Sequence, residues 1–149
     1  MLVFAGHLQA SWNVETVDSQ GSAGRNNSLA FDGDGTPGIA YRTCGGRNLK
    51  YAFRNGSAWT VEVVDDITNT GVYPSLAFDT SDFPRIAYMD YTERDLRYAW
   101  WNGSEWLLST VDAGGDTGWF SSLALDSLDR PGICYFQRDE GLVKYAYLN

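Results

Sequence analysis

The sequence has few of the residues that build disulfide-stapled, metal-binding or histidine-dependent proteins. It contains two cysteines, Cys44 and Cys134, one histidine, His7, and four prolines among 149 residues. Two cysteines do not make the framework of a small secreted scaffold, and free thiols favour a cytoplasmic location. A single histidine removes His-based general base catalysis and most metal sites. We therefore expect neither a metal nor a cofactor.

Positive charge is also scarce. Eleven Lys and Arg stand against 19 Asp and Glu, which gives a net charge of −8 and no basic run. This balance opposes binding to nucleic acid or to an anionic membrane surface. No segment is long and apolar enough to span a bilayer, and the short apolar run 1–6 lacks the basic leader of a signal peptide.

What the chain does have is a 47-residue unit that recurs without a gap. The stretch Ser28–Asp32 reads Ser-Leu-Ala-Phe-Asp, and it returns at residues 75–79 and 122–126 with one change in the last copy. Other residues keep the same spacing: Gly24, Gly71 and Gly118; Pro37, Pro84 and Pro131; Tyr41, Tyr88 and Tyr135; Tyr51, Tyr98 and Tyr145; Trp12, Trp59 and Trp106. Tandem β units of this length are typical of propellers.

Each unit predicts four short antiparallel strands. In the first complete unit they cover residues 28–32, 38–41, 49–53 and 59–65. The third strand alternates apolar and polar residues, and Asn55-Gly56 between the last two strands is a strong hairpin signal. The sequence thus predicts an all-β fold, with β-propeller blades of four antiparallel strands.

The register divides residues 1–149 of a single propeller domain into four parts. These are a partial leading unit with the third and fourth strands, 1–27, the complete units 28–74 and 75–121, and a last unit without its fourth strand, 122–149. Propellers usually close with four to eight blades. Three blades per chain therefore predict a six-bladed ring formed by a homodimer, with a nine-bladed trimer as the alternative.

The leading strand, residues 12–18, is expected to supply the missing edge strand, either to the last unit of its own chain or to that of a partner. Residues 1–8 duplicate the place of residues 142–149, so we expect them to have lost their role in a blade. The recurring tryptophans are expected to pack between blades, and Asp32, Asp79 and Asp126 to cap turns. Cys134 takes the place of Ala40 and Ala87, which predicts a small buried side chain.

The segment Leu96–Trp106, Leu-Arg-Tyr-Ala-Trp-Trp-Asn-Gly-Ser-Glu-Trp, resembles the fucose-binding propeller lectins of fungi and bacteria. Ile86-Ala87-Tyr88 resembles the strand that precedes this motif in the family. The resemblance implies a lectin-like propeller assembled from chains that carry few blades. Among the family's sugar contacts, Trp101 matches the third, whereas the Arg corresponds to Ala87 and the Glu to Tyr98.

Strand direction places two kinds of connection at opposite sides of the blades. The turns after the first and third strands meet on one side, the turn side, and are nearly identical in every unit. The loops after the second and fourth strands meet on the other, the loop side, and differ between units. Individual loops on a rigid scaffold are where binding sites are usually built. The candidate ligand-binding residues lie there: Tyr73, Asp90, Tyr91, Trp119, Phe120 and Arg138.

Three functions remain open for this loop side. The first is a non-enzymatic, lectin-like module, in which aromatic rings stack on pyranose faces while Asp and Arg hydrogen-bond hydroxyl groups. The second is a protein–protein interaction scaffold that uses the same surface. The third is a glycoside hydrolase, because two carboxylates suffice for that chemistry and Asp90, Glu93, Asp139 and Glu140 occupy equivalent loops.

Overall fold

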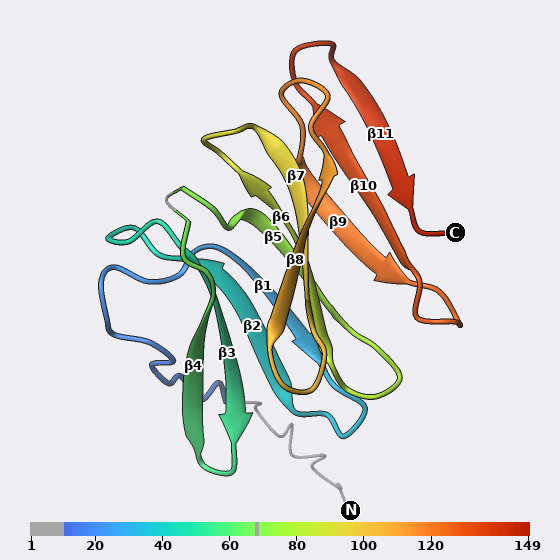
Figure 1. Cartoon of the computed structure of the whole chain (residues 1–149). Coiled ribbons are helices and arrows are strands. Elements are labelled where there is room, and N and C mark those ends of the chain that lie inside the picture. The colour runs from blue at the N-terminus through green and yellow to red at the C-terminus, as the bar shows by residue number, and fades with distance from the viewer. Residues whose placement is uncertain (1–10, 68) are drawn as a thin grey trace, which may run out of the picture.

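The computed structural model describes residues 11–67 and 69–149, and within them the chain forms eleven strands and no helix. The strands make three successive antiparallel sheets, arranged side by side along the molecule (Figure 1). Sheet 1 contains β1 (Arg25–Phe31), β2 (Pro37–Arg42), β3 (Leu49–Asn55) and β4 (Ala58–Asp65). Sheet 2 contains β5 (Val72–Phe78), β6 (Pro84–Asp90), β7 (Asp95–Trp101) and β8 (Trp106–Asp112). Sheet 3 contains β9 (Trp119–Leu125), β10 (Pro131–Gln137) and β11 (Leu142–Tyr147).

Within every sheet the strands follow chain order, so each connection is a simple antiparallel hairpin. The first strands of the three sheets also lie next to one another, β1 beside β5 and β5 beside β9. For residues 25–149, the repeat therefore predicted the strands and their order correctly. Within the described residues, no helix has the length and apolarity that a membrane crossing requires.

The turn after the first strand has the same length in all three sheets, and an aspartate side chain holds it in shape. Asp32 accepts hydrogen bonds from the backbone N–H groups of Asp34 and Thr36, at 3.1 and 2.7 Å. Asp79 and Asp126 make the same pair of contacts one and two units later. A short acceptor side chain that bonds the backbone two residues on is what such turns use. The predicted capping role is confirmed.

The core lies between sheets rather than inside one of them. One apolar cluster joins sheets 1 and 2, with Leu49, Tyr51 and Ile86 buried at its centre, and Trp106 packs against Tyr51 with ring centroids 5.5 Å apart. A second cluster joins sheets 2 and 3. Sheet 2 is thus apolar on both faces and buried on both. The fold is therefore stabilised mainly by the apolar surface that each sheet buries against the next.

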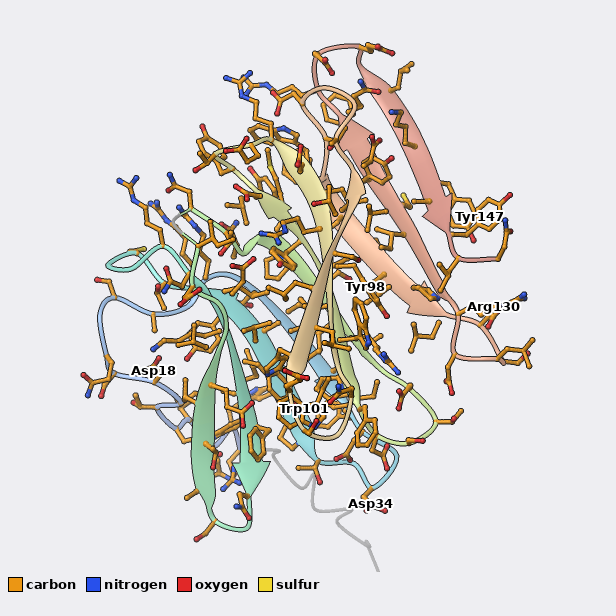
Figure 2. All side chains as sticks on the ribbon, viewed as in Figure 1. Asp18, Asp34, Tyr98, Trp101, Arg130 and Tyr147 are labelled. Atoms are coloured by element: carbon orange, nitrogen blue, oxygen red, sulfur yellow. The ribbon has the colours of Figure 1, made fainter. Side chains whose placement is uncertain are left out.

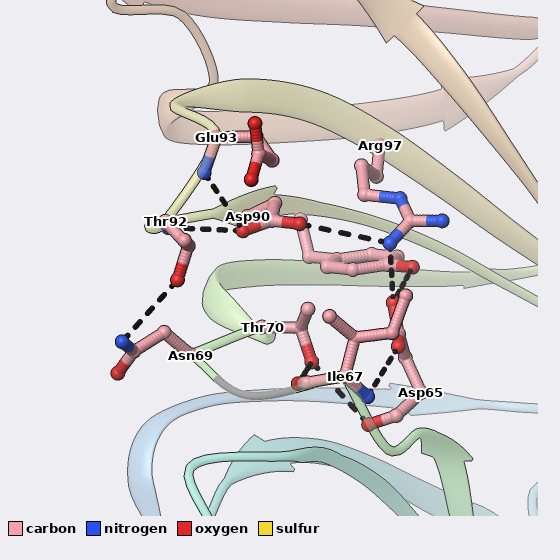
Figure 3. Close-up of polar contacts among 9 residues, drawn as sticks. Asp65, Ile67, Asn69, Thr70, Asp90, Thr92, Glu93 and Arg97 are labelled. Atoms are coloured by element: carbon pink, nitrogen blue, oxygen red, sulfur yellow. Dashed lines mark hydrogen bonds and ion pairs between the residues drawn. The ribbon is translucent and has the colours of Figure 1, made fainter.

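A repeated polar contact, which we name the acid–tyrosine–base link, ties each sheet to the element before it. Tyr88 donates to Asp65 at 2.6 Å, and Arg97 donates to the same carboxylate oxygen at 3.0 Å (Figure 3). Burial and the nearby Asp65 carboxylate raise the pKa of Tyr88 well above its ordinary value, so its hydroxyl remains a donor. Equivalent residues form the other two links: Asp18, Tyr41 and Lys50; Asp112, Tyr135 and Lys144.

The two outer sheets leave apolar faces open in the single chain. Leu76 of the middle sheet is 6% exposed, whereas its equivalent in sheet 1, Leu29, is 57% exposed. At the other end, Tyr145 is 66% exposed although its equivalent in sheet 2, Tyr98, is 8% exposed. Figure 2 labels Tyr98 within the stack and Tyr147 at its far end. We name these surfaces the sheet-1 end face, with Leu29 and Phe31, and the sheet-3 end face: Cys134, Val143, Tyr145, Tyr147 and Leu148.

The buried position expected for Cys134 is wrong for this chain, because Cys134 is exposed. Its equivalents Ala40 and Ala87 are fully buried, since each faces a following sheet. Cys134 points to the side of sheet 3 that no described residue covers. The repeat predicted the direction of the side chain but assumed a neighbour for it.

The leading segment, residues 11–24, forms no strand, in contrast to the strand expected over residues 12–18. It lies against sheet 1, at the opposite end of the molecule from sheet 3, as the labels of Asp18 and Tyr147 show (Figure 2). It therefore does not complete the last sheet of its own chain. Residues 1–8, which we expect to have lost their role in a blade, lie outside the described residues.

The contacts of this segment nevertheless repeat those of a fourth strand. Glu15 accepts a hydrogen bond from the Trp59 indole at 3.2 Å, as Glu62 of β4 does from Trp106 at 3.1 Å. Trp12, one repeat before Trp59, is 94% exposed. The segment occupies the position that a fourth strand takes relative to the following sheet, and among the described residues it pairs with no other strand.

Removal of the Asp65 carboxylate should destabilise the fold strongly. Asp65→Asn removes the charge that pairs with Arg97 and turns one of the two acceptor oxygens into an NH2 donor, so Tyr88, Arg97 and the Ile67 backbone N–H are left with one oxygen. Loss of one partner of a buried ion pair costs about 3 kcal/mol. Asp66→Asn, one residue away and exposed, is the matched control and should change the free energy of unfolding by under about 0.5 kcal/mol. Urea unfolding measures both, and equal stabilities of the two variants would contradict a structural role for the link.

Candidate functional site

Five of the six predicted ligand residues converge on the loop side, between sheets 2 and 3. The ring centroid of Tyr73 lies 4.4 Å from that of Phe120 and 5.5 Å from that of Trp119. Tyr91 lies edge-on to Trp119 at 6.1 Å, and the Arg138 guanidinium stacks over the Trp119 ring at 4.7 Å. We name these five side chains the aromatic cluster. They come from the starts of β5 and β9 and from the loops after β6 and β10.

Two members of the cluster have left-handed backbone conformations. Tyr73 has φ 51° and Phe120 has φ 54°, and the equivalent residue in sheet 1, Asn26, has φ 48°. A bulge in each first strand produces this conformation, because the pairing register shifts at that point. Asn tolerates positive φ, but bulky aromatic residues are strained there. Strained residues of this kind cluster at functional sites.

The members of the cluster differ in how much surface they offer. Trp119 is half-buried: Arg138 covers one face of its ring, and its indole donates to Asp116 at 2.7 Å. Phe120 is 63% exposed, and Tyr91 is also exposed. Trp119 and Arg138 therefore form the base of the cluster, while Tyr91 and Phe120 present rings to solvent.

Asp90, the sixth predicted residue, is separate from this surface. Its side chain is buried, and one carboxylate oxygen accepts hydrogen bonds from the backbone N–H groups of Thr92 and Glu93 (Figure 3). The other oxygen lies 3.7 Å from Arg97. Asp90 therefore holds the loop after β6 in shape, and a ligand on the loop side does not reach it.

A pocket of about 550 Å³ adjoins the cluster on the same side, between sheets 1 and 2. Tyr73 and Tyr91 line it from sheet 2, and three arginines line it from sheet 1: Arg25, Arg42 and Arg47. We name it the arginine pocket. The sequence analysis did not predict these arginines. They lie in the segments of sheet 1 that are equivalent, at a spacing of 47 residues, to the segments of sheet 2 that hold predicted ligand residues. The repeat indicates that these residues share the loop side with the predicted ones, but it does not show that the three arginines line one pocket.

Trp101, the family-matched residue, lies on the turn side instead. Its ring meets that of Trp106 edge-on at 5.7 Å, and both line a pocket of about 240 Å³ between sheets 1 and 2. The carboxylates of this pocket are engaged, since Glu62 accepts from Trp106 and Asp82 accepts from the Gly33 backbone at 2.6 Å. Across residues 11–67 and 69–149, His, Cys, Asp and Glu form no cluster of three that could hold a metal ion.

A comparison with solved structures finds chains of similar fold, one of which is a lectin. A fucose lectin from Kordia zhangzhouensis, solved in complex with methyl-fucoside, matches with a TM-score of 0.54 and 12% sequence identity. The match covers 82% of this chain and 91% of the lectin chain. The chain has a lectin-like all-β fold. No protein-family model matches the sequence, and no curated protein matches it.

The strain at Phe120 can be measured by comparing two truncations. Phe120→Ala and Phe120→Gly remove the same ring, but only glycine adopts φ 54° freely, so the glycine variant should be about 1 kcal/mol more stable. At Ala124 in the same strand, where φ is ordinary, glycine should instead be less stable than alanine by about 0.5–1 kcal/mol. Urea unfolding of the four proteins gives both differences. The same order of stability at both positions would show that Phe120 is not strained.

Proposed function

We propose that the protein is a non-enzymatic, lectin-like module that binds carbohydrate on its loop side. The observation that carries this proposal is the aromatic cluster, in which four rings and a guanidinium from two strand starts and two loops converge around strained backbone positions. Backbone strain of this kind persists only where the surrounding structure holds it, and Phe120 contributes little burial in return because its side chain is 63% exposed.

Carbohydrate suits this surface better than a purely apolar ligand does. The exposed rings of Tyr91 and Phe120 can cover the C–H faces of a pyranose, and the tyrosine hydroxyls are polar groups at the ring edges. Arg138 can donate to sugar hydroxyls with the N–H groups that do not face Trp119. The fold similarity to a fucose lectin is consistent with this class of ligand.

The proposed working form is a six-bladed β-propeller made of two copies, in which each sheet is one blade. Two features of the single chain support it. The end faces of sheets 1 and 3 expose apolar residues whose equivalents in sheet 2 are buried, and exposed apolar surfaces of this kind mark interfaces. A second copy, placed head to tail, covers the sheet-3 end face of one chain with the sheet-1 end face of the other.

The leading segment supports the same arrangement. It lies beside sheet 1 where the outer strand of a preceding blade would lie, and it pairs with no strand in the part of the chain that the structure describes. At the other end, β11 is the edge strand of sheet 3, which has three strands where the others have four. In the two-copy ring, residues 12–18 of one chain pair with β11 of the other. Trp12 of the partner then enters the space of about 690 Å³ beside Tyr98. At the equivalent place one sheet earlier, beside Tyr51, Trp106 fills this position.

A glycan array with the purified chain tests the proposed ligand class. We expect binding that weakens about tenfold or more in Tyr91→Ala and in Phe120→Ala, because each loses a stacking ring worth about 1.4 kcal/mol. Trp119→Ala should abolish binding, since it removes the base of the cluster. Trp101→Ala is the matched control on the turn side and should bind as the unchanged protein does.

Other outcomes would favour other functions. Silence of the array at several salt concentrations would contradict the carbohydrate proposal. Glycan binding that is lost only in Trp101→Ala would move the site to the turn side. Capture of a protein partner that Trp119→Ala prevents, without any glycan signal, would favour the interaction scaffold. Turnover of a glycoside that stops on substitution of Asp139 or Glu140 would favour the hydrolase.

A further inference from the structure

The arginine pocket concentrates positive charge on a strongly acidic protein. Arg25, Arg42 and Arg47 line one pocket, while the chain carries a net charge of −8. Within residues 11–67 and 69–149, no carboxylate lies within salt-bridge distance of any of the three. The arginines and lysines that do have carboxylate partners are Lys50, Arg54, Arg85, Arg97, Arg130 and Lys144. Arg94 and Arg138 also have no such partner among the described residues, but three of these five cations line this one pocket.

The hydrogen bonds inside the pocket leave donors in excess. Arg42 and Arg47 both donate to the same neutral acceptor, the amide oxygen of Asn69, at 3.1 and 3.2 Å. The Nε of Arg42 is buried and has no partner among the described residues. Buried polar groups normally find a partner, and guanidinium groups have only donors to offer. The pocket consequently needs an acceptor, and an anionic one satisfies the charge as well.

The electrostatics of Arg42 agree with this view. Burial lowers the pKa of Arg42, and the nearby charges of Arg47 and Arg25 lower it further. The two groups that act in the opposite direction and raise this pKa are Cys44 and Tyr91, and neither is a carboxylate. The guanidinium still carries its charge at neutral pH. A bound anion would offset both the desolvation and the repulsion between the arginines.

The repeat shows how this pocket differs from the equivalent place one unit later. Between sheets 2 and 3, the positions of Arg25 and Arg42 hold Val72 and Met89, and the position of Asn69 holds Asp116. The position of Arg47 keeps an arginine, Arg94, so one of the three cations is retained there. That second place carries the aromatic cluster instead. Tyr73 and Tyr91 line the arginine pocket and also belong to the cluster, so the two sites are contiguous. One ligand can reach both.

We propose that the arginine pocket binds the carboxylate or sulfate group of an acidic saccharide whose neighbouring ring lies on the aromatic cluster. This inference rests on the proposed carbohydrate-binding function and names its ligand class. Planar, bidentate recognition of carboxylate or sulfate is the chemistry for which guanidinium groups are suited. An uronic acid, a sialic acid and a sulfated sugar all present such a group beside a pyranose ring.

Calorimetric titration with matched sugars tests the proposal. The pairs are methyl glucuronide against methyl glucoside, for carboxylate, and galactose 6-sulfate against galactose, for sulfate. The acidic member of at least one pair should bind about tenfold tighter or more, which corresponds to one charge-assisted hydrogen bond of about 1.4 kcal/mol. That advantage should shrink as salt rises, because the contact is partly exposed to solvent.

Two substitutions in the pocket and one outside it complete the design. Arg42→Gln and Arg47→Gln should remove the advantage of the acidic sugar, and Arg47 is exposed, so its variant does not depend on repacking the pocket. Arg130→Gln makes the same change of net charge on an exposed arginine outside the pocket, paired with Asp126, and should keep the advantage. Cys44 also lines the pocket and is exposed, so the bound acidic sugar should slow its alkylation.

The outcomes separate this inference from the function on which it rests. Equal affinity for the acidic and neutral members of both pairs would overturn the inference and leave the carbohydrate proposal standing. No binding of any saccharide would overturn the carbohydrate proposal. A sulfated or phosphorylated peptide that binds through Arg42 while every saccharide fails would overturn both in favour of a peptide ligand.

Discussion

The fold depends on one constraint: each sheet is apolar on both faces and must be covered on both. Sheet 2 shows the satisfied state, with Ile86, Tyr88 and Leu96 fully buried between its neighbours. The acid–tyrosine–base links add direction to this stacking, because each joins the end of a fourth strand to the second and third strands of the following sheet. Asp18 makes the same link from the leading segment, so even the start of the described chain is placed by the contact that orders the sheets.

Much of this architecture could be predicted from the repeat because recurring residues have recurring physical roles. The strands, the hairpin turns and the capping by Asp32 each depend on a few neighbouring residues, which the sequence displays directly. Cys134 and the segment 12–18 departed from expectation for a common reason. Their roles depend on a neighbouring sheet, and a repeat pattern cannot tell whether that sheet is present in the same chain.

The candidate site was predictable in part for a different reason. Loop residues at equivalent positions meet on one side of the stack, which brought Tyr73, Trp119 and Arg138 together as expected. Asp90 lies at the loop side like these residues, because it is the last residue of β6. Its carboxylate is nevertheless buried against Arg97 and the backbone of Thr92, which the sequence does not show. The arginine pocket was missed because it combines three loops whose residues are unremarkable one at a time. The combined site therefore needed the structure, although its two halves are related by the repeat.

The strained backbone of the aromatic cluster and the open end faces lie at different parts of the molecule. Loop-side residues can vary without loss of the stack, while the end faces must match each other if the ring is to close. The central claim is that two copies of the chain cover each other's end faces. Its most direct test is the particle mass, measured by sedimentation equilibrium of the 149-residue chain over a wide range of concentration. The account predicts a particle of twice the 16.6 kDa chain mass, down to low concentration. A stable monomer, with both end faces open to water, would contradict it, and a particle of three chains would replace the six-bladed ring by a nine-bladed one.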